Sequence, residues 1–199
     1  DKNLYQSFVD VKSLNFCSWT DITSEFEYDP KAPYFSLVVP TEDTTRYRYL
    51  TKTLAEHNFP VLLVGQTGVG KSVIVQSLCN ELVETDKFAS ITVNYSAQTS
   101  PKNLVTVFEA KLEQKRKNLL GAPVGKRMLM FVDDLNMPAQ EKFFAQPCNE
   151  LLRQVMTESL SSNIKGGGYY DTKKLFWKSI QDVVIMSACA PPGGGRKDV

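Results

Sequence analysis

Hydrophobic residues along this chain gather into short uninterrupted runs, and between the runs they recur at helical spacing. Runs such as 61–64 and 128–132 are typical of strands buried on both faces. The expected strands are 60–64, 90–96, 127–135 and 182–190, and the expected helices are 71–83, 100–115 and 149–160. This alternation predicts an α/β fold in which a mostly parallel sheet is covered on both faces.

Two segments depart from the alternation. Residues 1–35 carry no sustained hydrophobic period, and we interpret them as an N-terminal linker or flank. Residues 163–181 contain a glycine triplet beside aromatic residues, which predicts a loop or hairpin insertion. We therefore expect a flank over 1–35 and one α/β domain over 36–199.

Two shorter patterns complete the secondary-structure prediction. Residues 34–39 have the composition of a short strand, and Thr41 is expected to cap a helix over 42–56. The charged run 111–117 is interpreted as the solvated face of a helix.

Composition narrows the class of protein. The 199 residues are 42% hydrophobic and 23% charged, with a net charge of +1, which predicts a globular protein without the basic surface that nucleic acid or anionic lipid requires. No apolar run approaches the about 18 residues of a membrane span. The 4 cysteines lie far apart without a C-x-x-C pair, so we expect reduced thiols and no zinc site.

A glycine-rich stretch between an expected strand and an expected helix carries the clearest chemistry. It matches the phosphate-loop pattern G-x-x-x-x-G-K-[ST] in full: Gly65, Gln66, Thr67, Gly68, Val69, Gly70, Lys71 and Ser72. Glycines let successive backbone amides face anionic oxygens, and the helix that follows adds its positive dipole end. Lys71 is expected to neutralise the outer phosphates, and the Ser72 hydroxyl to bind Mg²⁺. The alternative is a tight corner without a ligand.

A second half-site is expected at the end of another buried strand. Asp133 and Asp134 follow the apolar run 128–132 directly. Carboxylates at the carboxyl end of a parallel strand face the same crevice as the phosphate loop. Asp133 is expected to hold Mg²⁺ through water, and Asp134 to orient an attacking water as a base. The alternative is a pair of acids that begins a surface loop.

Three longer segments give a more specific resemblance. They are "VDDLNMPAQEKFFAQPCNELLRQ", "CSWTDITSEFEYDPKAPYFSLVVPT" and "APPGGGR". Together they resemble the third AAA+ module of a dynein heavy chain of the axonemal type. The insertion over 163–181 also resembles a hairpin shared with the MoxR and midasin relatives.

The resemblance implies a three-layer α/β/α P-loop NTPase of the AAA+ class. Such a module binds ATP or ADP with Mg²⁺ and belongs to a microtubule motor of the cytoskeleton in the ciliary or flagellar axoneme, on the cytoplasmic side. The implied partners are neighbouring AAA+ modules of the same chain, dynein intermediate and light chains, and a microtubule reached through a distant stalk. The expected nucleotide contacts are the phosphate-loop residues with Val73, Pro40 and Thr41.

Departures from the family pattern bear on turnover. Active relatives usually place Glu after the metal-binding Asp, whereas this chain has Asp134, which is one methylene shorter. A polar sensor, commonly Asn, is replaced by Ala190. Because hydrolysis needs a base within reach of the water, we expect nucleotide binding with weak or slow hydrolysis and a regulatory role.

The sequence also stops after the fourth strand expected by the family pattern. We therefore expect a fragment that lacks the fifth strand, the helical lid and its own arginine finger, and that associates more readily than a complete module. Two alternative functions stay open at this point. One is a MoxR- or midasin-like remodelling ATPase, and the other is a structural ring module locked on its nucleotide.

Overall fold

The computed structural model describes residues 4–26, 30, 38–157, 167–171, 174–193 and 196. The chain divides into two compact units, Asp1–Thr53 and Leu54–Val199.

The first unit begins with a short antiparallel hairpin. Its regular elements are η1 (Leu4–Gln6), β1 (Ser7–Asp10), β2 (Asn15–Ser18), α1 (Trp19–Ile22) and the first part of α2 (Glu42–Glu56). The hairpin turn is closed by Asp10, whose carboxylate accepts hydrogen bonds from the backbone amides of Lys12 and Ser13. The sequence pattern of 1–35 did not predict η1, β1, β2 and α1, since each contains only a few residues and shows no extended period.

An aromatic cluster holds the first unit together. The Trp19 ring is stacked on Phe8 with centroids 4.6 Å apart, and Tyr49 of α2 meets Trp19 edge-on at 5.5 Å. The start of α2 agrees with the predicted bounds, and the Thr41 hydroxyl accepts a hydrogen bond of 3.2 Å from the amide of Thr44. Thr41 is therefore the predicted cap. Residues 34–37 of the expected strand lie outside the described residues, and Val38 and Val39 are not in a strand.

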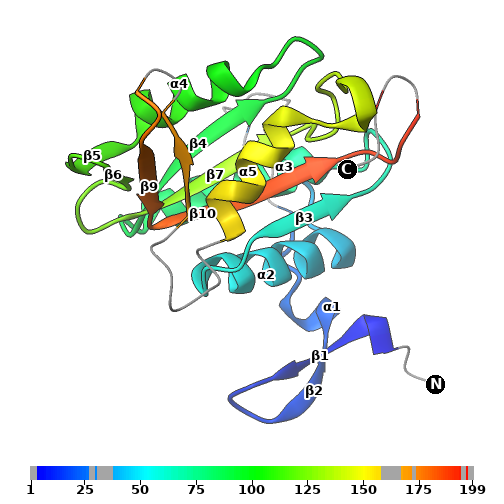
Figure 1. Cartoon of the computed structure of the whole chain (residues 1–199). Helices are drawn as coiled ribbons and strands as arrows, with labels where there is room; N and C mark the ends of the chain where they lie inside the picture. Colours follow the sequence, from blue (N-terminus) through cyan, green and yellow to red (C-terminus); the bar gives the residue numbers. More distant parts are fainter. Residues whose placement is uncertain are drawn as a thin grey trace. The chain divides into compact units, whose positions relative to one another are not determined.

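The second unit is built on a four-stranded parallel sheet (Figure 1). Its strands stand in the order β3-β10-β7-β4, so the first and last strands of this sheet along the chain are neighbours. Their bounds are β3 (Val61–Val64), β4 (Phe88–Asn94), β7 (Arg127–Asp133) and β10 (Val183–Cys189). All four expected strands are confirmed, and so is the predicted α/β class.

Strand β7 shows why the sheet needs cover on both faces. Its side chains alternate between two apolar clusters: Leu129 and Phe131 belong to one, and Met128, Met130 and Val132 to the other. Because successive side chains of a strand point to opposite faces, a strand buried on both faces reads as a continuous apolar run. That is the pattern from which the strand was predicted.

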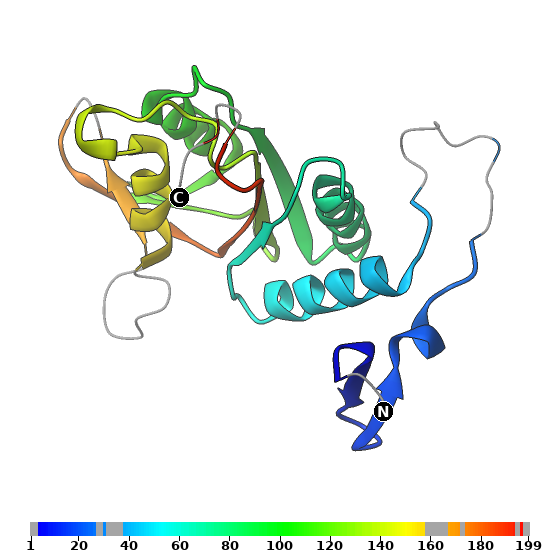
Figure 2. The same cartoon turned by 90° about the vertical axis from the view of Figure 1, so that its right-hand side faces the viewer.

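Three helices provide the cover (Figures 1 and 2). Helix α3 (Lys71–Glu84) packs on one face, where Val75, Leu78 and Leu82 contribute to the cluster with Leu129. Helices α4 (Pro101–Lys111) and α5 (Pro147–Thr157) cover the other face. This arrangement gives the three layers, helix, sheet and helix, of the predicted architecture.

A second four-stranded sheet flanks the first. Its order is β5-β6-β9-β8, with bounds β5 (Glu113–Arg116), β6 (Leu119–Gly121), β8 (Gly168–Tyr170) and β9 (Trp177–Gln181). Strands β8 and β9, which lie within 163–181, form an antiparallel pair. Residues 163–166 and 172–173 of the expected insertion lie outside the described residues. The sequence did not indicate that β9 would pair in parallel with β6.

One helix prediction was wrong at its end. The helix expected over 100–115 ends at Lys111. Most of the charged run 111–117, interpreted as a helix face, instead forms β5, which spans Glu113–Arg116. Leu112 adopts an extended conformation and is 5% exposed, so its side chain enters the core there. Burial of Leu112 and pairing of β5 with β6 outweigh the modest helix preference of Glu, Gln, Lys and Arg, as tertiary context commonly does.

Candidate nucleotide-binding site

The glycine-rich loop connects the end of β3 to the start of α3. Gly68 and Gly70 have φ values of +86° and +88°, a left-handed conformation that costs other residues energy. A Cβ atom on either glycine would meet no atom within 4 Å. The backbone conformation, rather than a lack of space, is therefore what requires glycine at these two positions.

The Lys71 ammonium group lies against the loop. Its Nζ donates hydrogen bonds of 2.7 Å to the carbonyl oxygens of Gly65 and Gln66. The first turn of α3 has no side-chain cap at Gly70 and no acidic residue. Its backbone amides and dipole therefore face the loop together with a cation, which is the arrangement that binds anions at a helix N-terminus.

The two acids stand at the carboxyl end of β7. Asp133 is its last residue, and its Oδ1 accepts a hydrogen bond of 3.0 Å from the amide of Asp134. Asp134 has a φ of +53°, so the chain turns sharply after the strand. Both residues are partly buried, which is compatible with carboxylates that face a crevice.

Strand β10 lies between β3 and β7 and joins the two half-sites. The amide of Gly65 donates to the carbonyl oxygen of Cys189 at 3.2 Å, and the amide of Leu135 donates to that of Ala188 at 3.0 Å. Successive carbonyls of a strand point to opposite neighbours. One strand end is thus bonded to the start of the phosphate loop on one side and to the segment after the acids on the other.

A side chain adds a third bond at the same strand end. Asn136 is 1% exposed, and its Nδ2 donates a hydrogen bond of 2.7 Å to the carbonyl oxygen of Ala190. In the sequence, Asn136 stands out only as part of a family signature. Its position two residues after Asp134 is the signal that would have placed it near the site.

The Cys189 thiol, in the last residue of β10, is affected by a charge from each half-site. Burial raises the pKa of this thiol, the positive charge of Lys71 lowers it, and the negative charge of Asp134 raises it. Both side chains therefore act on the same sulfur atom. Lys71 and Asp134 therefore both lie near the end of β10, and their joint action on one bound ligand stays a prediction.

Arg196 is a further residue at this crevice. Its Nη2 lies 3.7 Å from Oδ1 of Asp134, although the sequence analysis recognised it only as the end of "GGGR". Pro40 and Thr41 belong to the first unit, and their contact with a nucleotide stays a prediction. The same holds for Val73, an exposed residue in the first turn of α3.

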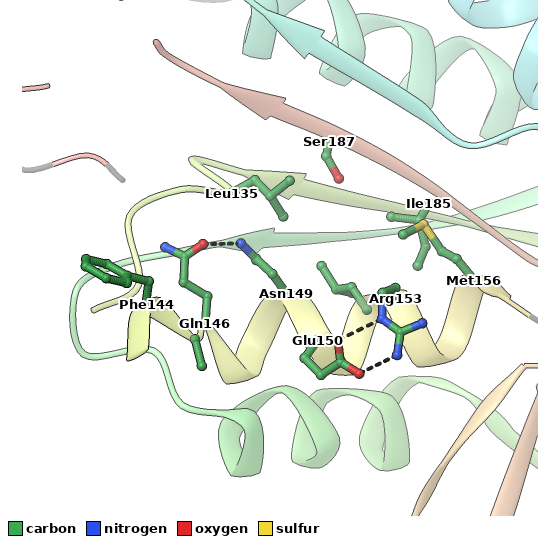
Figure 3. A pocket seen from close by; sticks show the side chains of 11 residues that line it. Leu135, Phe144, Gln146, Asn149, Glu150, Arg153, Met156, Ile185 and Ser187 are labelled. Carbon is green, nitrogen blue, oxygen red and sulfur yellow. Dashed lines mark hydrogen bonds and ion pairs between the residues drawn. The ribbon is translucent and has the colours of Figure 1, made fainter. Parts of the chain in front are cut away.

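A separate hollow of about 640 Å³ lies along α5 (Figure 3). Its lining includes Leu135, Phe144 and Ile185, and Gln146 accepts a hydrogen bond of 2.7 Å from Asn149 at its side. None of the residues predicted to bind phosphate or metal lines it. The site at the strand ends must therefore be inferred from chemistry rather than from the size of a cavity.

Comparison with known proteins identifies the family. Residues 26–199 match the family described as the P-loop containing dynein motor region. The chain belongs to this dynein motor family. It is 47% identical over 197 residues to human dynein axonemal heavy chain 6, covering 99% of this chain and 4% of that protein.

Two further relatives have the same relationship to this dynein motor region. Human dynein axonemal heavy chain 2 is 39% identical over 194 residues, which cover 97% of this chain and 4% of that protein. The Dynein-1-beta heavy chain of the flagellar inner arm I1 complex from Chlamydomonas reinhardtii is 39% identical over 194 residues, again 97% of this chain and 4% of that protein. The chain thus spans about 4% of the length of these relatives.

The residues present fit a magnesium nucleotide. The uncapped α3 N-terminus and Lys71 offer donors and charge to a phosphate, and Ser72 and Asp133 are the residues that would offer oxygen atoms to Mg²⁺. In the described ranges no group of three or more His, Cys, Asp or Glu side chains is placed to hold a metal by itself. Mg²⁺ in nucleotide sites is commonly held by one or two protein oxygens together with phosphate and water.

Within the same described ranges, no helix is long and apolar enough to cross a membrane.

Proposed function

We propose that this dynein motor region binds ATP or ADP with Mg²⁺ as the third AAA+ module of an axonemal dynein heavy chain. The observation that supports nucleotide binding best is the arrangement around β10. Its terminal carbonyls are bonded to the phosphate loop at Gly65 and to the segment after the acids at Leu135. A ligand bound by the loop would therefore lie beside the carboxylates.

Each side chain has a distinct part in this proposal. Lys71 exchanges its bonds to the carbonyls of Gly65 and Gln66 for bonds to the outer phosphates. The hydroxyl of Ser72 and the carboxylate of Asp133 hold Mg²⁺, the latter through water. The bound cation neutralises negative charge on the phosphate oxygens. Asp134 orients a water molecule as a weak base.

Slow hydrolysis and a regulatory role follow from two side chains. The Asp134 carboxylate is one methylene shorter than that of Glu and would reach less far toward the attacking water. Ala190 has no polar side chain, and its carbonyl oxygen already accepts the bond from Asn136. Neither residue belongs to the phosphate loop. We therefore expect nucleotide binding to be retained and nucleotide hydrolysis to be weakened.

The wider context is proposed from the relatives. Their names place them in axonemal dyneins and in a flagellar inner arm. We propose that this chain works in the cytoskeleton of a ciliary or flagellar axoneme, on the cytoplasmic side. Its partners would be neighbouring AAA+ modules, dynein intermediate and light chains, and a microtubule reached through a distant stalk.

A second function fits the same two side chains. A module that binds nucleotide and does not hydrolyse it would act as a structural part of the ring. In a full-length heavy chain, Lys71→Ala and Asp134→Asn separate these functions. A regulatory ATPase loses phosphate release from this site in both variants. A locked structural module releases no phosphate before or after the changes, yet it still requires Lys71 for bound nucleotide.

The binding proposal is tested with the 199-residue chain and a Lys71→Ala variant. Loss of the loop cation should weaken Mg-ATP and Mg-ADP by at least about a hundredfold, because charge-assisted contacts to phosphate are among the strong ones. Lys102→Ala, at an exposed position of α4, is the matched control. Titration calorimetry and a thermal melt measure affinity and folding. Unchanged affinity in Lys71→Ala would contradict the proposal.

A further inference from the structure

Arg196 and Asp134 form an ion pair at the mouth of the crevice. The distance between Arg196 Nη2 and Asp134 Oδ1 is 3.7 Å, and the Arg196 side chain is 24% exposed, against 46% for Asp134. The two residues follow different parallel strands, β10 and β7. Neighbouring parallel strands end at the same edge of a sheet, so Asp134 stands at the edge where β3 leads into the phosphate loop, and Arg196 lies beside it.

A backbone bridge to Gly193 holds Arg196 near this edge. Gly193 and Arg196 form a β-bridge with two backbone bonds, Gly193 N to Arg196 O at 3.1 Å and Arg196 N to Gly193 O at 3.0 Å. Gly193 has a φ of +128°, a conformation that favours glycine. The backbone of Arg196 is therefore held in place, while the outer part of the guanidinium reaches the acid.

The guanidinium is incompletely bonded. Within the part of the chain that the structure describes, the buried Nε of Arg196 has no hydrogen-bond partner. A guanidinium has five N–H donors arranged to meet planar carboxylate or phosphate oxygens. A single contact of 3.7 Å to Asp134 satisfies few of them, so Arg196 has the capacity to bind a second, more highly charged anion.

We propose that Arg196 recognises the terminal phosphate of ATP and makes this site discriminate ATP from ADP, an inference that rests on the proposed nucleotide binding. The guanidinium pairs with the Asp134 carboxylate when no terminal phosphate is present and moves to that phosphate when ATP binds. Ala190, which directly follows β10, has no polar side chain that could contact this phosphate. In this proposal Arg196, six residues later in the chain, makes that contact instead.

The chemistry of the two ligands explains the discrimination. ATP carries a phosphate beyond the position where ADP ends, and the water that Asp134 would orient attacks that phosphate. A cation beside Asp134 is therefore near the additional charge of ATP. ADP gains nothing from Arg196, because its phosphates are held by the loop amides and Lys71. The same movement leaves the Asp134 carboxylate without its partner, so the base is released only when ATP is bound.

The first test compares affinities for Mg-ADP and for a non-hydrolysable Mg-ATP analogue. Arg196→Gln removes the charge and should lower the affinity for the ATP analogue by about tenfold or more, while the affinity for ADP changes by less than about twofold. Arg196→Lys keeps the charge and should lose less. Arg116→Gln, at an exposed position of β5, is the matched control. Retained ADP affinity shows that the variant is folded and that its phosphate loop is intact.

A double-mutant cycle tests the competition with the acid. Asp134→Asn removes the resting partner of Arg196, so it should increase the affinity for the ATP analogue. The increase should be about threefold or more larger in the wild-type background than in Arg196→Gln. Equal strengthening in both backgrounds would overturn the switch between the two anions.

The outcomes separate the two proposals. If the wild-type chain binds neither nucleotide, the proposed function fails. If it binds both, and Arg196→Gln leaves the ratio of the two affinities unchanged, only the assignment of Arg196 is overturned. A parallel loss of ADP and analogue affinity also overturns it, because a residue that recognises the terminal phosphate has no contact with ADP.

Discussion

The side-chain amide of Asn136 donates a hydrogen bond of 2.7 Å to the carbonyl oxygen of Ala190, and both residues are buried. The bond joins the segment that follows the acids of β7 to the end of β10. With the amide bond from Gly65 to Cys189, it connects the phosphate loop, the central strand and the acids. Asn136, which was not predicted to bind phosphate or metal, therefore contributes to the connection between the two half-sites.

The first prediction concerns this bond. Asn136→Ala removes the amide and leaves the Ala190 carbonyl buried without that donor, which should lower the free energy of unfolding by about 1–3 kcal/mol. Asn80→Ala, at an exposed position of α3, should change it by less than about 0.5 kcal/mol. Urea unfolding followed by circular dichroism measures both values. Equal stability of the two variants would show that the bond contributes nothing measurable.

The second prediction concerns the thiols. Burial raises the pKa of Cys79 to about 11 and also raises the pKa of Cys148 and Cys189, whereas Cys17 is only partly buried. The reactive form is the thiolate, and a raised pKa means less thiolate at pH 8. At that pH, a chromogenic disulfide reagent should react rapidly with Cys17, and with the three buried thiols only in denaturant.

A Cys17→Ser variant is the control for this experiment, since it should lose the rapid phase. Raising the pH toward about 11 should increase the reactivity of Cys79, because its thiolate becomes populated only as the pH approaches its own pKa. Rapid reaction of two or more thiols in the native chain at pH 8 would contradict the burial described for Cys79, Cys148 and Cys189.

The third prediction concerns turnover. Asp134→Glu extends the base, and Ala190→Asn supplies a polar sensor. In a full-length heavy chain whose main ATPase site is disabled, the pair of changes should raise phosphate release from this site by about tenfold or more. The single changes should give less. Turnover at a typical motor rate before the changes, or no increase after them, would contradict the expected weakness of Asp134 and Ala190.

The fourth prediction concerns the outer side of β3. Leu62 and Val64 are 47% and 63% exposed, and among the described residues β3 pairs only with β10. Exposed apolar strand edges favour association between chains. Leu62→Lys should reduce self-association of the 199-residue chain, as measured by light scattering across a range of concentrations.

A matched change on another surface controls for net charge. Gln76→Lys alters an exposed residue of α3 by the same charge, and it should leave association almost unchanged. Equal suppression by both variants would assign the effect to charge repulsion. A wild-type chain that stays monodisperse at high concentration would contradict the prediction outright.

Much of the second unit was predictable because its signals are local. A strand buried on both faces must be apolar at nearly every position, as β7 is from Met128 to Val132, and a phosphate loop needs glycine where φ is positive, as at Gly68 and Gly70. Such requirements act within a few residues and leave a pattern in the chain. The cap of α2 by Thr41 is local in the same sense.

The error at the end of α4 shows where local signals fail. Residues 111–117 contain Glu, Gln, Lys and Arg, which suit an exposed helix as well as an edge strand. The choice was made by the burial of Leu112 and by pairing with β6, and neither is visible in the run itself. Propensity differences among such residues are small compared with the energy of burying a leucine.

The sequence by itself determined the α/β class, the phosphate loop around Lys71 and the acids at the end of β7. Each is encoded by residue type at fixed spacing. Only the tertiary structure decided that Asn136 bonds to Ala190, 54 positions away, and that Arg196 lies beside Asp134. The physical reason is the strand order: β10 lies between β3 and β7, so the ends of three strands that are distant in the chain meet at one edge.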